Sequence, residues 1–126
     1  MIGASRQLHV LACTAPVDMR KGFEGLSALV RQVLHRDPLS GELYLFTNRT
    51  RKRAKVLLWD GTGLCLYAKR LEKGRFADLA RRGTGTSLVL TATELQLFLE
   101  GSDLIGRRSL SPSILSENDL VIRVPV

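Results

Sequence analysis

Three short apolar runs between residues 42 and 68 restrict the fold more than any other feature of the sequence. The runs cover residues 42–47, 55–59 and 64–68. A polar segment separates the first two, and Asp60-Gly61 between the last two is a strong signal for a tight hairpin. We therefore predict an antiparallel three-stranded meander. Because apolar residues occupy both parities of each run, we expect these strands to be covered on both faces or to lie in a barrel-like sheet.

A helix is predicted upstream of these runs, over residues 23–34. Its apolar positions fall on one stripe of a 3.6-residue period: Phe23, Leu26, Val30, Val33 and Leu34. Asp18 lies just before this segment, where a carboxylate would cap the first turn. A short strand is predicted at residues 8–13. The segment 37–41, with its proline and glycine, is predicted to end the helix and turn the chain.

The rear of the chain contains a further strand and a shorter helix. Residues 71–86 include three glycines and are predicted to be irregular, and residues 87–90 are predicted to form a strand. Thr91 and Glu94 have the spacing of a capping box at the start of a short helix that Gly101 would end.

We predict an α+β fold, with a small antiparallel sheet, meander or barrel-like, and one long and one short helix. In this interpretation residues 1–106 form one domain. Residues 107–126 form a Ser-rich segment and an apolar tail, docked or flexible.

The charge is distributed unevenly along the chain. The 126 residues include 19 Lys and Arg and 12 Asp and Glu, for a formal net charge of +7. Residues 1–82 carry 16 basic and 7 acidic side chains, whereas residues 83–126 carry 3 and 5. A basic front and a mildly acidic rear favour a polyanionic partner for the front.

Several classes of protein are disfavoured by composition. No apolar run approaches the roughly 20 residues of a membrane-spanning helix, and the amino terminus lacks the apolar stretch of a secretory signal. We therefore expect a cytoplasmic protein without membrane contact. Cys13 and Cys65 are expected to be buried free thiols. Together with His9 and His35 they show no paired ligand spacing, so we expect no metal site and no cofactor.

The densest cationic segment is residues 48–55, on the predicted loop between the first two strands of the meander. Its cations are Arg49, Arg51, Lys52, Arg53 and Lys55. Cations that neutralise phosphates release counterions and give strong, salt-dependent binding to nucleic acid. Asn48 and Thr50 can add hydrogen bonds to phosphates or base edges. The alternative is a solvated loop that protects a sheet edge.

A second cationic segment, residues 69–76, directly follows the third strand of the meander. Its cations are Lys69, Arg70, Lys73 and Arg75. Tyr67 and Phe76 flank this segment and can stack on bases, but we expect both of them, and Trp59, to be core residues because the chain has few large aromatic side chains.

Other cations carry weaker signals. Asp18-Met19-Arg20-Lys21 precedes the first predicted helix, and Arg20 and Lys21 would favour a phosphate at its amino terminus. The pairs Arg81-Arg82 and Arg107-Arg108 are interpreted as solvated surface.

No catalytic constellation is recognisable in the sequence. Two-metal nuclease chemistry requires converging carboxylates, and each candidate in the front half has a simpler structural explanation: Asp18, Glu24, Asp60, Glu72 and Asp78. There is no P-loop, no nucleophile elbow and no cysteine with an obvious histidine partner. We therefore expect no enzyme activity and no small-molecule substrate.

Several motifs, taken in order, resemble one family. They lie at residues 16–23, 37–41, 46–49, 55–61 and 67–76. In these motifs the chain resembles TnpB, the second-open-reading-frame (Orf2-like) accessory proteins of the insertion-sequence family numbered sixty-six. The resemblance covers about residues 8–100. Besides the two cationic segments it rests on Asp18, Met19, Arg20, Lys21, Trp59, Asp60 and Gly61. The chain departs from the family at Ala77-Asp78, where members often have an aromatic-proline step.

The resemblance implies a small bacterial protein that accompanies a separate transposase, which carries the catalytic carboxylates. We therefore expect a non-catalytic accessory protein that acts in DNA transposition and binds DNA through the two cationic segments. The alternative is an adaptor that binds the transposase without contacting DNA, using the apolar residues 120–126. The DNA hypothesis requires the two cationic segments to meet on one face of the folded chain.

Overall fold

The meander predicted between residues 42 and 68 is present in the structure. In the computed structural model, which describes residues 9–102, strands β2 (Leu43–Thr47), β3 (Arg53–Trp59) and β4 (Leu64–Arg70) pair antiparallel in that order. Asp60 closes the β3–β4 turn, because its Oδ1 accepts hydrogen bonds from the N–H groups of Thr62 and Gly63 at 2.9 Å each. Gly61 adopts a φ of +104° there, a conformation that side chains disfavour. The hairpin prediction is confirmed.

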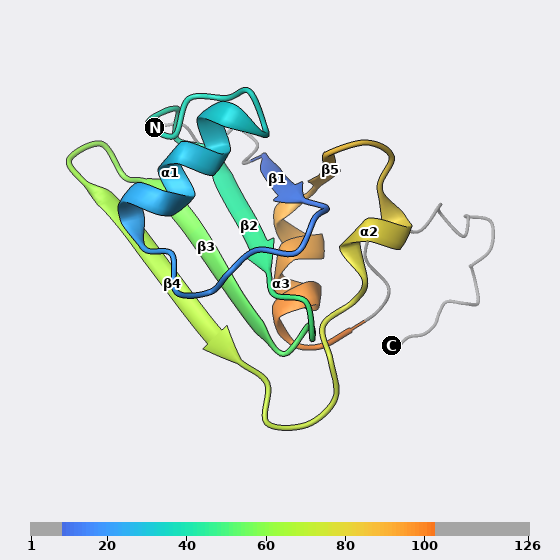
Figure 1. The fold of residues 1–126 in the computed structure, drawn as a ribbon. Coiled ribbons are helices and arrows are strands. Elements are labelled where there is room, and N and C mark those ends of the chain that lie inside the picture. Colours follow the sequence, from blue (N-terminus) through green and yellow to red (C-terminus); the bar gives the residue numbers. More distant parts are fainter. Residues whose placement is uncertain (1–8, 103–126) are drawn as a thin grey trace.

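The complete sheet is mixed and open, which corrects the prediction of an antiparallel or barrel-like sheet. β1 (Val10–Cys13) pairs parallel with β2, and β5 (Ser87–Leu90) pairs antiparallel with the other side of β1. The strand order is β4-β3-β2-β1-β5, so β4 and β5 are the two edges (Figure 1). β1 and β2 run in the same direction because helix α1 (Phe23–Gln32) carries the chain back between them.

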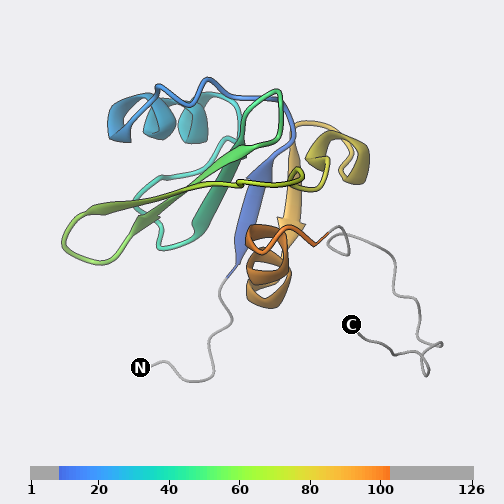
Figure 2. The ribbon, with the colours of Figure 1, turned by 90° about the horizontal axis from the view of Figure 1, so that it is seen from below.

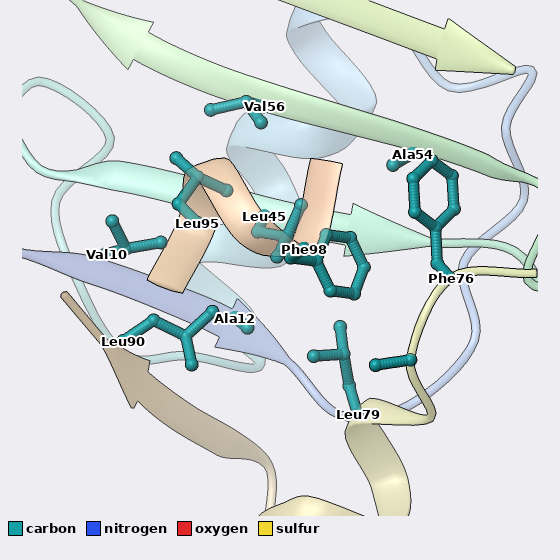
Figure 3. Close-up of a cluster of buried hydrophobic side chains, with 11 residues drawn as sticks. Val10, Ala12, Leu45, Ala54, Val56, Phe76, Leu79, Leu90, Leu95 and Phe98 are labelled. Carbon is teal, nitrogen blue, oxygen red and sulfur yellow. The ribbon is translucent and has the colours of Figure 1, made fainter. Parts of the chain in front are cut away.

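Helices on both faces explain why apolar residues occupy both parities of β2. Figure 2 shows α1 and α3 (Ala92–Leu99) on opposite faces of the sheet. Tyr44 and Phe46 of β2 pack in the α1-side core with Leu26 and Val30. Leu45, between them, packs in the α3-side core, which Figure 3 shows in close-up. We call these faces the α1 side and the α3 side.

The expectation of two covered faces is wrong for β4. As an edge strand it leaves Cys65 exposed and Tyr67 52% exposed, so neither the predicted buried thiol nor the predicted core aromatic is found at these positions. Cys13, in contrast, is buried as predicted. Phe76 is fully buried, as predicted, and Trp59 is half-buried.

The helix boundaries differ in part from the predicted ones. α1 ends at Gln32, two residues before the predicted end, and its N-cap is Gly22. The predicted cap by Asp18 is wrong, because that carboxylate instead accepts hydrogen bonds from the backbone N–H and the guanidinium of Arg20. A one-turn helix, α2 (Leu79–Arg82), lies in the segment predicted to be irregular, and Asp78 caps it by accepting a bond from Ala80 N–H.

The capping box of the last helix is confirmed. Thr91 Oγ1 accepts a hydrogen bond from Glu94 N–H at 3.0 Å, and Glu94 Oε1 accepts one from Thr91 N–H at 2.8 Å. Gly101, at φ +90°, ends α3, and its N–H donates to Phe98 O at 2.9 Å.

Some expectations fall outside the described residues. These are the start of the first strand at Leu8, the Ser-rich segment, Arg107-Arg108 and the apolar residues 120–126. Within residues 9–102, no helix is long and apolar enough to cross a bilayer.

Candidate nucleic-acid interface

The two cationic segments lie side by side at one end of the sheet. The loop 48–52 joins β2 to β3, and residues 71–76 follow β4, which ends beside the start of β3 (Figure 1). Backbone hydrogen bonds join the two: Leu71 N–H donates to Lys52 O at 2.8 Å, and Phe76 N–H donates to Arg51 O at 2.7 Å. Segments that are about twenty residues apart in sequence are therefore held in contact.

A third segment, residues 16–21, reaches the same end. β1 runs parallel to β2, so both strands finish there, and Val17 N–H donates to Thr47 O at 2.8 Å. We call residues 16–21, 48–55 and 69–76 together the basic end. It contains eleven Lys and Arg and two acidic residues. The acidic ones are Asp18, 2.7 Å from the Arg20 guanidinium, and Glu72, 3.2 Å from that of Arg70. The excess of positive charge is therefore large.

The pairing of Asp18 with Arg20 explains the state of the acid. Hydrogen bonds from the Arg20 side chain and backbone lower the pKa of the Asp18 carboxyl well below its usual range. This acid is therefore ionised at neutral pH, and it offsets the charge of Arg20 locally.

Two cations brace the loops against each other. The Arg51 guanidinium donates to Phe76 O at 3.3 Å, and Lys52 Nζ donates to Gly74 O at 3.2 Å. Arg51 has a φ of +60°, a left-handed conformation that is uncommon for residues other than glycine. Because a carbonyl oxygen does not neutralise a cation, both residues still contribute positive charge.

Two further cations brace more distant parts of the fold. Lys55 Nζ donates to Met19 O at 2.8 Å and to Lys21 O at 2.9 Å, so it holds the segment that leads into α1. Lys69 Nζ donates to Leu99 O at 2.6 Å, at the end of α3. Both had been expected to contact DNA, and the structure assigns each of them a structural contact.

Asn48 likewise has a structural contact. Its Oδ1 accepts hydrogen bonds from the N–H groups of Lys52 and Arg53 at 3.1 Å each, which closes the loop. The oxygen that was expected to contact phosphates or bases therefore stabilises the loop itself.

Four of the nine expected site cations remain available for a ligand. The side chains of Arg49, Arg53, Lys73 and Arg75 are exposed and form no hydrogen bond or ion pair within residues 9–102. Arg70 is also exposed and is paired with Glu72. These side chains are free to reorient toward an anion.

The register of β3 and β4 divides the cations between the two faces. Arg53 lies directly opposite Arg70, and Lys55 opposite Ala68, on the α1 side. Lys69 lies opposite Ala54 and belongs to the α3 side. Like charges directly opposite each other in a sheet destabilise it. The Arg53–Arg70 pair is therefore unfavourable unless an anion or solvent screens it.

Two hollows on the α1 side share Arg53. One, of about 530 Å³, lies between Arg20 and Arg49, with Met19 in its wall. The other, of about 440 Å³, lies between Lys55 and Arg70. Guanidinium groups around a shallow, partly apolar hollow suit the phosphate and sugar of a nucleic-acid backbone.

The family motif at Trp59, Asp60 and Gly61 lies at the opposite end of the β3–β4 hairpin. There, hydrogen bonds from Thr62 and Gly63 N–H lower the pKa of Asp60 to about 2. This motif is therefore a turn-forming element, remote from the basic end.

Sequence reasoning missed the arginines of α2. Arg81 and Arg82 were interpreted as solvated surface, whereas the structure brings them beside Arg51 and Arg75. No local pattern signals this arrangement, because it depends on where buried Phe76 directs the chain.

A metal centre finds no support in the part of the chain that the structure describes. Within residues 9–102, no group of three or more His, Cys, Asp or Glu side chains is placed to hold a metal ion.

Comparison with known proteins gives one family. A family model described as "IS66 Orf2 like protein" matches residues 8–109. Two similar proteins come from Sinorhizobium fredii (strain NBRC 101917 / NGR234), and both are described as uncharacterized. Protein y4jC is 43% identical over 76 residues, which are 60% of this chain and 65% of y4jC, just under two thirds of it. Protein y4hO is 35% identical over 103 residues, 82% of this chain and 88% of y4hO. No solved structure matches.

Proposed function

Because the chain belongs to the IS66 Orf2-like family, an insertion-sequence accessory family, we propose that it acts in DNA transposition by binding duplex DNA through its basic end. One observation carries the proposal. Two cationic segments from different loops are joined by backbone hydrogen bonds at one end of the sheet. Eleven cations against two carboxylates produce a local positive potential that attracts a polyanion.

The basic end divides the work of binding between two groups of cations. Arg49, Arg53, Lys73 and Arg75 are exposed and without partners among residues 9–102, so they contact phosphates directly. The cations bonded to carbonyl oxygens hold the loops in place. A preordered loop loses less conformational entropy on binding, which raises affinity. Contacts of this kind position a protein on DNA and carry no sequence information by themselves.

The test is the salt dependence of duplex binding, measured by fluorescence anisotropy. The Arg49→Ala/Arg53→Ala variant removes two unbraced cations and leaves the loop hydrogen bonds intact. We expect the slope of log K against log salt to decrease by about 2 units, close to 1 unit per phosphate contact.

The matched control is Arg31→Ala/Arg36→Ala. Arg31 lies in the last turn of α1 and Arg36 just beyond it, while α1 begins at the basic end, so the control removes the same charge elsewhere. A wild-type protein without salt-dependent binding, or equal effects of the two double variants, would contradict the proposal.

The alternative function, an adaptor for the transposase, is favoured by the edge strand β5. Val89 of β5 is 65% exposed and borders a hollow of about 420 Å³ beside the first turn of α3. A partner strand could add to this edge and cover that side chain. In that case Val89→Lys abolishes copurification with the transposase and leaves the DNA salt slope unchanged. Copurification that survives this change would count against the adaptor.

A further inference from the structure

A third hollow, of about 330 Å³, opens at the basic end on the α3 side. Four arginines line it: Arg51, Arg75, Arg81 and Arg82. Its wall also includes Phe76, a member of the α3-side core. The two hollows that share Arg53 instead contain Met19, which packs against the α1-side core. The third hollow is therefore separated from the other two by the end of the sheet.

The four arginines come from three different elements. Arg51 belongs to the loop 48–52, Arg75 to the segment after β4, and Arg81 and Arg82 to α2. Phe76 links the first two, because its N–H and C=O are both hydrogen-bonded to Arg51 and its ring is fully buried. Leu79, 2% exposed, fixes α2 to the same core. The positions of these arginines are thus set by buried neighbours.

The charge in this hollow is unbalanced. The only carboxylate in its lining is that of Asp78, whose Oδ1 accepts the Ala80 N–H at 3.1 Å and caps α2. Arg51 uses one of its five N–H donors on Phe76 O, so the others are available. The side chains of Arg75 and Arg81 are exposed and have no partner within residues 9–102. Converging guanidinium groups repel one another, and they match the oxygen atoms of a phosphate.

We propose that this hollow is a second phosphate-binding site, with Arg51, Arg75 and Arg81 as its ligands. The inference rests on the proposed function, and it adds a geometric requirement. A bound nucleic acid presents one backbone phosphate to the α1 side, at Arg53, and another to the α3 side, at Arg75 and Arg81. The ligand therefore passes over the end of the sheet, and the loop 48–52 lies between the two phosphate contacts.

The experiment compares three double variants that each remove two positive charges. Arg75→Gln/Arg81→Gln tests the new site, Arg49→Gln/Arg53→Gln tests the α1 side, and Arg31→Gln/Arg36→Gln is the control. Thermal unfolding first establishes that each variant folds. We expect the salt slope for duplex DNA to fall by about 2 units in each of the first two variants. The effects should add in the quadruple variant, and the control should change little.

A second measurement separates the site from the DNA proposal. Inorganic phosphate is titrated into the wild-type protein, and the Nε–Hε NMR signals of Arg75, Arg81 and Arg31 are followed. We expect saturable shifts at Arg75 and Arg81 and none at Arg31.

The outcomes distinguish the two proposals. An unchanged DNA slope in Arg75→Gln/Arg81→Gln, together with a reduced slope in Arg49→Gln/Arg53→Gln, would overturn the second site and leave the proposed function standing. Saturable phosphate shifts at Arg75 and Arg81 without any duplex affinity would support the site and overturn the proposed function. Absence of both responses would overturn both.

Discussion

The aromatic ring of Phe76 stacks on that of Phe98, with 4.9 Å between the ring centroids and 9° between the ring planes (Figure 3). Both rings are fully buried. Phe76 ends the second cationic segment and Phe98 belongs to α3, so this contact attaches the basic end to the α3-side core. Because Phe76 also bonds Arg51 through its backbone, the buried ring fixes the position of the loop 48–52.

Phe76→Ala should destabilise the protein by about 3–5 kcal/mol, the usual cost of removing a buried aromatic ring and leaving a cavity. Urea denaturation measures this free energy of unfolding. The control is Phe23→Ala, since Phe23 is 47% exposed and should cost much less. Similar losses in the two variants would show that the Phe76 ring is not an anchor.

Lys69→Met should separate a structural cation from a purely electrostatic one. Lys69 Nζ bonds Leu99 O at 2.6 Å, so its removal should cost about 1–3 kcal/mol of unfolding free energy. Lys73→Met removes an exposed cation without a partner in the described chain, and it should cost less than about 0.5 kcal/mol. Equal stabilities of the two variants in urea denaturation would exclude a bracing role for Lys69.

Arg53→Thr should raise stability and weaken DNA binding at the same time. Arg53 lies directly opposite Arg70, and removing one of two facing like charges should stabilise the sheet by a few tenths of a kcal/mol, about 0.2–1 kcal/mol at low salt. The gain should shrink as salt screens the pair. Thermal unfolding at two salt concentrations, combined with anisotropy, checks both effects. A variant that loses stability would show that the pair is not repulsive.

Asp60 should make stability depend on pH in the acid range. Its pKa is about 2 in the folded chain and close to 3.9 when unfolded, so the unfolded state binds the proton more tightly. The stabilisation is therefore complete above the unfolded value and disappears as pH falls from about 4 to about 2. We expect wild type and Asp60→Asn to differ by a constant amount above about pH 5 and to converge near pH 2. An NMR titration midpoint of Asp60 near 3.9 would contradict this expectation.

The two thiols should differ in reactivity. Cys13 is buried, and burial raises its pKa, whereas Cys65 is exposed on β4. A thiol reagent should modify Cys65 in the native protein and Cys13 only after unfolding. The pKa of Cys65 is itself raised, because its Sγ donates to Asp60 Oδ2 at 3.4 Å, so Asp60→Asn should accelerate its modification. Cys65→Ser should abolish the native-state reaction, and residual labelling of that variant would place the reactive thiol at Cys13.

The sequence alone was sufficient for the elements that local rules control. The Asp60-Gly61 hairpin, the Thr91–Glu94 capping box and the helix end at Gly101 all depend on neighbouring residues, and all three are found. The register of the meander follows from the hairpin in the same way. Both-parity apolar strands correctly indicated a sheet with helices on two faces for β2, although not for the edge strand β4.

Tertiary structure alone decided how distant segments meet. The pairing of β1 with β2, which makes the sheet mixed, depends on how α1 packs and not on the strands themselves. The bonds from Lys55 to Met19 O and from Lys69 to Leu99 O join residues about thirty or more positions apart, as does the gathering of Arg81 with Arg51. Charge could be counted from the sequence, but its direction in space could not. A side chain points where its backbone is held, and the buried core, through Phe76 above all, holds that backbone.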